Sequence, residues 1–239
     1  MTIDFHAYSD IGGREENEDT VAYRDFGTCQ VALMADGLGG HGDGKRASRS
    51  VCESLLRCAG RERLPTQAEL AQDFDLANRE LLLRQSNTFH MKTTAVCLCL
   101  SENRAIWGHI GDSRLYHVFQ NELCDYTLDH SASQLAVFMG EIKRSEIPGH
   151  VDRSSLLKAL GVRGARPEIH APVTLAPGRH LFLLCTDGLW EYLDDETVVR
   201  EGEKAASARE LIEALLELHD ARCGSDCDNH SALALYVRI

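Results

Sequence analysis

The chain has 239 residues, of which 44% are hydrophobic and 26% charged, a composition typical of a globular protein. Its formal net charge of −12 argues against a surface that binds nucleic acid, because such a surface needs clustered basic residues to release counterions. No apolar run approaches the roughly 18 residues that suggest a membrane span, and the first residues lack the pattern of a signal peptide, so we expect no membrane partner.

Six apolar runs predict strands, in chain order at 31–35, 93–100, 105–110, 114–119, 180–185 and 231–237. Several runs are too uniformly apolar for a sheet with one solvated face, so we expect strands covered on both faces. Apolar residues take up helical spacing near Val51, and capping boxes beginning at Thr66 and Ser207 predict two further helix starts. The short turn at 102–103 favours antiparallel hairpins over crossovers. We therefore expect an α+β fold in a single domain, residues 1–239.

Acidic residues stand at the ends of these apolar runs. They are Asp36, Asp112, Asp187 and Asp228, the first three beside a glycine. Each one alone is ordinary turn chemistry, since Asp and Gly favour turns. Four carboxylates at one edge of a sheet repel one another, and a set of oxygen ligands suits Mg²⁺ or Mn²⁺ rather than Zn²⁺. A glycine after Asp36 lets the backbone approach such an ion, so the carbonyl of Gly37 is a further candidate ligand.

A polar segment at 9–20 has the sequence SDIGGREENEDT. Arg14 stands among acids here, which is also the appearance of an ordinary solvated run of charges. The functional alternative is an arginine that grips phosphate, with Glu18 and Asp19 close to the metal.

Six short motifs follow one another along the chain: G-x-R-x-x-N-E-D at 12–19, A-D-G-x-G-G at 35–40, G-D-S-R at 111–114, D-H-S at 129–131, T-D-G at 186–188 and D-N at 228–229. In type and order they resemble the motifs of the metal-dependent serine/threonine protein phosphatases of the 2C type. The likeness is greatest to the compact bacterial branch and covers nearly the whole chain.

The resemblance implies a four-layer α-β-β-α sandwich, with two central antiparallel sheets flanked by helices and the metals at one end. It implies that Asp36 bridges two Mn²⁺ or Mg²⁺ ions, with the Gly37 carbonyl on the first ion. Asp187 and Asp228 would complete the second ion, and these three aspartates are the expected catalytic residues. Asp112 would bind a third, weaker ion together with Asp187.

The resemblance also assigns the polar segment. Arg14 would bind the substrate phosphate, Glu18 and Asp19 would hold waters of the ions, and Asn229 would support them from behind. The implied reaction is hydrolysis of phosphoserine or phosphothreonine in proteins by a metal-activated water, which reverses the action of a protein kinase. The expected partners are phosphorylated proteins, among them a Ser/Thr kinase and its substrates, and we expect a monomer.

This sequence departs from the family pattern in places. Leu38 stands where many eukaryotic members carry a His that is a proposed general acid. His41 is a nearby candidate for that acid, against a structural or exposed role. The match is loose over 132–153, the variable flap of the family, where we expect substrate choice to be determined.

Two other functions stay open at this point: a catalytically dead member that binds phosphoproteins, and a divalent-ion-dependent hydrolase of nucleotides or other small phosphates. No cysteine is followed by Arg six positions later, so the cysteine-phosphatase signature is absent.

The nine cysteines are an odd number without the density of a secreted scaffold, which favours a reducing cytoplasm. His219, Cys223, Cys227 and His230 form a loose zinc-like set, but the spacing of the cysteines is atypical. A surface loop with reduced thiols is the preferred interpretation, with an oxidisable Cys223–Cys227 pair as the alternative.

Overall fold

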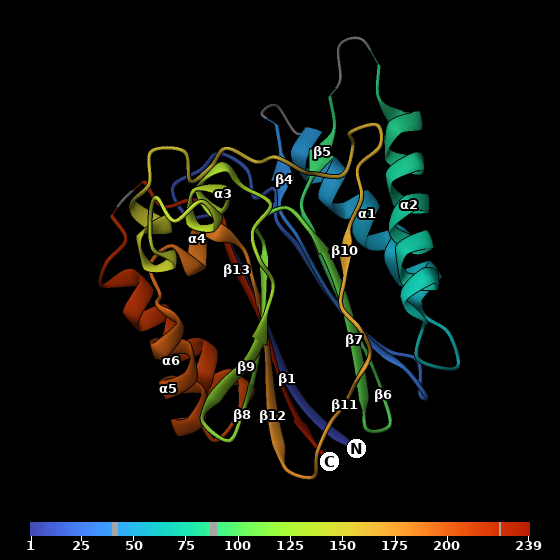
Figure 1. Ribbon diagram of the computed structural model, residues 1–239, viewed down its shortest axis with the longest axis vertical. Helices are drawn as coiled ribbons and strands as arrows, with labels where there is room; N and C mark the ends of the chain where they lie inside the picture. Colours follow the sequence, from blue (N-terminus) through green and yellow to red (C-terminus); the bar gives the residue numbers. More distant parts are fainter. Residues whose placement is uncertain (40–42, 87–89, 225) are drawn as a thin grey trace.

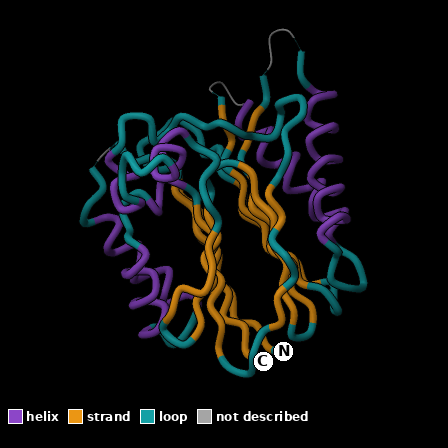
Figure 2. The backbone as a smooth tube through the Cα atoms, viewed as in Figure 1, coloured by secondary structure: helices purple, strands orange, loops and turns teal. Residues whose placement is uncertain are grey.

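The computed structural model describes residues 1–39, 43–86, 90–224 and 226–239. Two antiparallel sheets pack face to face, and helices cover the outer face of each (Figures 1 and 2). The five-stranded sheet runs in the order β1 (Thr2–Asp10), β13 (His230–Arg238), β12 (Arg179–Cys185), β8 (Arg114–Phe119), β9 (Glu122–Tyr126). The six-stranded sheet runs β10 (Glu168–Ile169), β7 (Arg104–Ile110), β6 (Ala95–Ser101), β3 (Gln30–Ala35), β2 (Thr20–Asp25), with β11 (Val173–Thr174) also paired to β7. A small ribbon joins β4 (Gly37–Leu38) to β5 (Lys92–Thr93).

Two pairs of helices form the outer layers. The six-stranded sheet is covered by α1 (Asp43–Ala59) and α2 (Gln67–Arg84), and the five-stranded sheet by α5 (Asp195–Lys204) and α6 (Ala208–Asp220). Short helices α3 (Ala132–Phe138), η1 (Arg144–Gly149) and α4 (Asp187–Trp190) lie in the connections. The capping box predicted at Thr66 is present, because its side chain accepts from the Glu69 amide while the Glu69 carboxylate accepts from the Thr66 amide.

Three apolar cores separate the four layers. In β6, Val96 and Leu98 point into the core between the sheets, whereas Cys97 and Cys99 point into the core beneath α1 and α2. Each strand that is buried on both faces reads as a continuous apolar run, as the sequence predicted. The expected α+β fold with two central antiparallel sheets and flanking helices is confirmed.

The sequence pattern did not predict β1, β2, β9 or α5. Strand β1 lies at the edge of its sheet and is half exposed, so its sequence TIDFHAYSD carries only a weak apolar signal. Its register with β13 pairs Ser9 with Ser231 and Asp10 with His230. This pairing brings the polar segment that follows β1 beside Asp228, which precedes β13.

The two ends of the sandwich differ. Both termini lie at one end, whereas α3, α4, β4 and β5 lie at the other (Figure 1). Within the described parts of the chain, no helix is both long and apolar enough to cross a membrane.

Candidate metal and phosphate site

At the end of the sandwich away from the termini, the strand ends open into a cavity of about 850 Å³. Its lining includes most of the residues singled out in the sequence: Arg14, Glu18, Asp36, Asp112, Asp187 and Asp228. Gly37 and Asn229 also contribute to the wall. Residues far apart in the chain are thus brought to one site, as the contact between Arg14 and Asp228, 214 positions apart, illustrates.

Asp36 directly follows β3, and its backbone is fixed on both sides. Its amide donates to Thr94 Oγ1 at 2.9 Å, and its carbonyl accepts from Thr93 Oγ1 at 2.7 Å. The next residue, Gly37, lies directly against the first turn of α1, since a Cβ at Gly37 would fall 2.1 Å from the carbonyl oxygen of Gly44. The glycine after Asp36 is therefore required by close packing of the backbone, which the sequence pattern alone could not distinguish from turn chemistry.

Asp112 lies in the connection from β7 to β8. These strands belong to different sheets, so the connection crosses the sandwich and is not a hairpin turn. The Asp112 carbonyl accepts from Trp190 Nε1 at 3.0 Å, and the preceding Gly111 donates to His130 Nδ1 at 3.1 Å. Only 3% of Asp112 is exposed, and these contacts hold it at the cavity wall.

Trp190 also contacts a buried ion pair. The guanidinium of Arg114 donates to both carboxylate oxygens of Asp129 at 2.8 and 2.6 Å and lies 3.4 Å from the centre of the Trp190 ring. The side chains are 6% and 2% exposed. Both residues belong to motifs noted in the sequence, but their pairing was missed, because nothing in the spacing of 15 residues indicates a contact.

The polar segment is tied to the start of β13 by Asn229. The Asn229 amide group donates to the carbonyls of Ile11 and Glu16 at 2.8 and 3.0 Å, and its Oδ1 accepts from the Glu18 amide at 2.8 Å. Arg14 Nη2 donates to Asp228 Oδ2 at 2.7 Å at the mouth of the cavity, where the two side chains are 57% and 43% exposed. The arginine expected to bind phosphate therefore contacts one of the expected metal ligands.

The carboxylates at this site are crowded. Removal from water and the neighbouring acids raise the pKa of Asp187 to about 7, and the same two causes raise the pKa of Asp19 to about 6. The pKa values of Asp36 and Asp112 are raised well above the usual range, again first by removal from water and then by Asp187. Such a cluster is electrostatically unfavourable by itself, because burial and like charges both penalise the ionised form. A divalent cation would offset both penalties.

The donor set fits hard divalent ions. The cavity is lined by Asp36, Asp187 and Asp228, whose side chains offer carboxylate oxygens. Mg²⁺ and Mn²⁺ prefer ligands of this kind. Behind them, Asp19 accepts from Thr186 Oγ1 at 2.9 Å through Oδ2, while its buried Oδ1 has no hydrogen-bond partner among the described residues. An unpaired buried carboxylate oxygen at this position is suited to a water or ion of the site.

Two further features predicted from the sequence are His41 and the flap at 132–153. His41, the candidate general acid, lies outside the described residues. The expected flap, 132–153, contains α3 and η1, and the residues just after it, Ser154 and Leu156, line the cavity. Arg153 donates to Glu191 at 2.9 Å, which connects the end of this segment to the residue after α4.

The preferred interpretation of Cys223 and Cys227 as reduced thiols was wrong, and the alternative of an oxidised pair is confirmed. Cys223 and Cys227 are joined by a disulfide, because the turn that follows α6 brings their Cα atoms to 6.0 Å, within the normal range for such a bond. The zinc-like set noted in the sequence, which was not the preferred interpretation, lacks free thiolates in this state, since each sulfur is bonded to the other. The seven remaining cysteines are free.

Comparison with known proteins agrees with the motifs. The family model for protein phosphatase 2C matches residues 8–220. The serine/threonine protein phosphatase PstP of Mycobacterium tuberculosis is 30% identical over 238 residues, covering 90% of this chain and 42% of PstP, so this chain spans about two fifths of that relative.

Solved structures extend the likeness to the fold. The crystal structure of the Mycobacterium tuberculosis serine/threonine phosphatase PstP/Ppp superimposes with a TM-score of 0.86 at 28% identity and covers 100% of both chains. A structure of the catalytic domain of PstP in complex with two manganese ions has a TM-score of 0.84 at 27% identity and covers 98% of both chains. With a family match over most of its length, the chain belongs to the protein phosphatase 2C family.

Proposed function

We propose that this protein is a metal-dependent phosphatase that hydrolyses phosphoserine and phosphothreonine in proteins. The observation that carries the proposal is the convergence of Asp36, Asp187 and Asp228 on one cavity, with Arg14 at its mouth. The manganese-bound relative and the serine/threonine phosphatase names of the similar proteins support the same assignment.

Two Mn²⁺ or Mg²⁺ ions are the proposed cofactors. Asp36 would bind both ions, the Gly37 carbonyl would bind one of them, and Asp187 and Asp228 would bind the other. The ions would lower the pKa of the attacking water and neutralise the phosphoryl oxygens. Hydrogen bonds from Thr93 and to Thr94 hold the backbone of Asp36, which would keep its carboxylate close to the ions. Asp112, held at the wall by Trp190, is proposed to form a weaker third site with Asp187.

Arg14 is proposed to bind the substrate phosphate. Its contact with Asp228 is exposed, so exchanging that carboxylate for a phosphate costs little desolvation. A planar guanidinium can hold two phosphate oxygens at once. Glu18 and Asp19 lie next to the expected ligands, where they can orient water, and Asn229 holds the segment that carries them through its contact with the Glu18 amide.

The proposal extends to the setting of the enzyme. The partners are phosphorylated proteins, among them a Ser/Thr kinase and its substrates, and the enzyme acts as a monomer. Residues 1–239 form one catalytic domain, with 132–153 as the flap that contacts substrate. A cytoplasmic location is supported by the seven free cysteines.

The test compares three substrates under controlled metal. Protein dialysed against EDTA should not hydrolyse a phosphothreonine peptide, and added Mn²⁺ should restore turnover. The peptide and p-nitrophenyl phosphate should be hydrolysed, and ATP should not. Full activity in the chelator would contradict the metal mechanism, and a preference for ATP would identify a hydrolase of small phosphates.

A further inference from the structure

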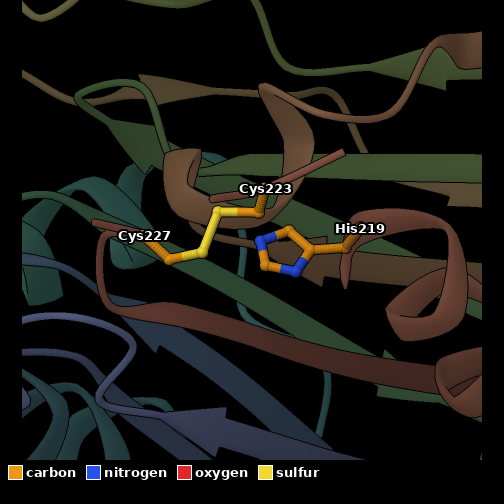
Figure 3. A group of neighbouring side chains, drawn as sticks. All are labelled: His219, Cys223 and Cys227. Atoms are coloured by element: carbon orange, nitrogen blue, oxygen red, sulfur yellow. A yellow bond between two sulfur atoms is a disulfide. The ribbon is translucent and has the colours of Figure 1, made fainter. Parts of the chain in front are cut away.

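The disulfide between Cys223 and Cys227 lies beside the proposed metal site. It closes the loop between α6 and β13, directly before Asp228. Figure 3 shows both sulfur atoms beside the ring of His219, with one ring nitrogen directed at them. A ring nitrogen of His219 and the two sulfur atoms lie within 4.8 Å of one another.

One side of this loop supports the phosphate-binding segment. The carbonyl of Cys227 accepts from the amide of Gly13 at 2.8 Å, one residue before Arg14. Gly12 lies so close that a Cβ there would fall 2.3 Å from the carbonyl oxygen of Asp228, and its φ of +58° favours glycine. The position of Cys227 therefore affects Arg14 and Asp228 together.

The other side supports the loop of Asp187. His219 has no exposed surface, and its Nε2 lies 3.0 Å from the carbonyl of Gly188, the residue after Asp187. The ring stacks on His230 with the ring centres 4.3 Å apart. The disulfide thus lies between the backbone segments that carry two proposed ligands of one ion.

Cys223 and Cys227 are less buried than most other cysteines of the chain. Cys29, Cys52, Cys97, Cys99 and Cys185 are buried, whereas Cys223 and Cys227 are only partly buried. We therefore expect small oxidants and reductants to reach this pair more readily than the buried cysteines. Cys124 is exposed but is not disulfide-bonded, which makes it a suitable control.

We propose that Cys223 and Cys227 are a reversible thiol–disulfide switch that sets how tightly the adjacent metal site binds its ion. This regulation rests on the proposed function, since the ion is the one that Asp187 and Asp228 would share. The disulfide form is the tight-binding form. Reduction frees the loop, loosens the contact between Cys227 and Gly13, and weakens the hold on Asp228.

The chemistry requires a two-electron oxidant, for which a hydroperoxide is the proposed class. One thiolate attacks the O–O bond to give a sulfenic acid and an alcohol, and the second thiol displaces the hydroxyl as water. Two thiols and one hydroperoxide thus give one disulfide, one alcohol and one water. A dithiol reverses the reaction through a mixed disulfide.

The experiment uses the unmodified sequence in its two redox states. Metal-free protein is treated with hydrogen peroxide or with a dithiol, the reagents are removed, and mass spectrometry verifies a difference of about 2 Da for one disulfide. Calorimetric titration with Mn²⁺ should give binding about tenfold weaker in the reduced state, the size expected for loss of support behind a metal ligand. Hydrogen exchange at the Gly13 amide should be faster in the reduced state.

Variants separate this pair from the other thiols. Cys124→Ser should behave like the unmodified protein in both states. The double variant Cys223→Ser, Cys227→Ser should show the weaker affinity after either treatment. Equal Mn²⁺ affinity and equal Gly13 exchange in the two verified states would overturn the switch, as would failure of peroxide to form the disulfide. Neither measurement needs turnover, so a redox-dependent affinity in a protein without phosphatase activity would contradict the proposed function and leave the switch standing.

Discussion

Two arginine–aspartate pairs lie at the same end of the sandwich, and they differ in almost every physical respect. Arg114 and Asp129 form two hydrogen bonds to each other, are almost fully buried, and lie against Trp190. Arg14 and Asp228 form one hydrogen bond at the mouth of the cavity, with about half of each side chain exposed.

The difference indicates separate tasks for the two pairs. A buried pair is costly to break, because the remaining charge is left without water or partner. An exposed pair contributes about 0–1 kcal/mol and can exchange partners readily. The buried pair is therefore suited to hold the frame around Asp112, whereas the exposed pair is suited to bind and release charged ligands.

The largest expected effect is on turnover, from a change at Asp36 in the cavity wall. Asp36→Asn replaces the proposed bridging carboxylate with a neutral amide. We expect hydrolysis of a phosphothreonine peptide to fall by at least about a thousandfold, roughly 4 kcal/mol in the activation barrier. Thermal unfolding without metal should be unchanged or shifted upward, since the substitution removes one of several repelling carboxylates. A variant that keeps a tenth of the activity would contradict the bridging role.

Breaking the buried pair should mainly lower stability, whereas Asp36→Asn should mainly lower turnover. Asp129→Ala leaves the Arg114 guanidinium buried without its partner, and we expect the free energy of unfolding to fall by about 3–5 kcal/mol. Denaturant titration measures this loss. The control is Glu53→Ala, which removes an exposed partner of Arg49 and should change the stability by less than about 1 kcal/mol. Similar losses of stability in both variants would show that burial does not make the Arg114–Asp129 pair costlier to break than the exposed Arg49–Glu53 pair.

The two pairs also differ in how far the sequence could predict them. Motif order identified Arg114 and Asp129 as members of two family-like motifs, but a contact between residues on different elements depends on how those elements pack. The apolar runs predicted the central strands because burial on both faces leaves a continuous signal, as in β6. Edge strand β1 has no such signal and was missed, although it carries the polar segment to Asp228.

The composition of the cavity was easier to predict than its support. Asp36, Asp112, Asp187 and Asp228 were found from their position after or before apolar runs, which is a local property. The hydrogen bonds of Asn229 to three backbone groups of the polar segment were not predictable, since they require the fold. The disulfide was missed for a related reason, because its formation depends on how the turn after α6 places two side chains.

His117, in the interior between the two sheets, gives a prediction about the pH dependence of stability that involves neither pair. Removal from water, followed by the nearby His180 and His170, lowers the pKa of His117 to about 4. In the unfolded chain this pKa is about 6.5, so between pH 6.5 and 4 the unfolded state takes up a proton that the folded state refuses, which destabilises folding by up to about 3 kcal/mol. His117→Phe should remove this part of the acid sensitivity.

The measurement for His117 is the change in unfolding free energy between pH 7 and pH 4, compared between variant and wild type. The comparison cancels the titration of groups shared by both proteins. Phe can keep the stacking that His117 makes on Phe182, where the ring centres are 4.5 Å apart, although His180 Nδ1 loses its partner at 3.0 Å. That loss lowers stability at both pH values. An unchanged pH dependence would show that His117 is not held neutral in the folded protein.

The smallest expected effect is at the exposed pair. Arg14→Ala should raise KM for a phosphothreonine peptide by about tenfold, or about 1.4 kcal/mol, while kcat falls less. The reason is that a guanidinium binds phosphate in the ground state and the transition state alike, so it contributes mainly uniform binding. The stability should change by less than about 1 kcal/mol, because the contact with Asp228 is exposed.

Arg14→Lys is the matched control for geometry. Lysine keeps the charge but cannot hold two phosphate oxygens in a planar fork, so its KM should lie between those of wild type and Arg14→Ala. If both variants lost kcat a thousandfold with KM unchanged, Arg14 would act on the transition state. Arg14 would then be as important for turnover as Asp36. Solvent exposure of an ion pair would no longer indicate that the pair only binds and releases ligands.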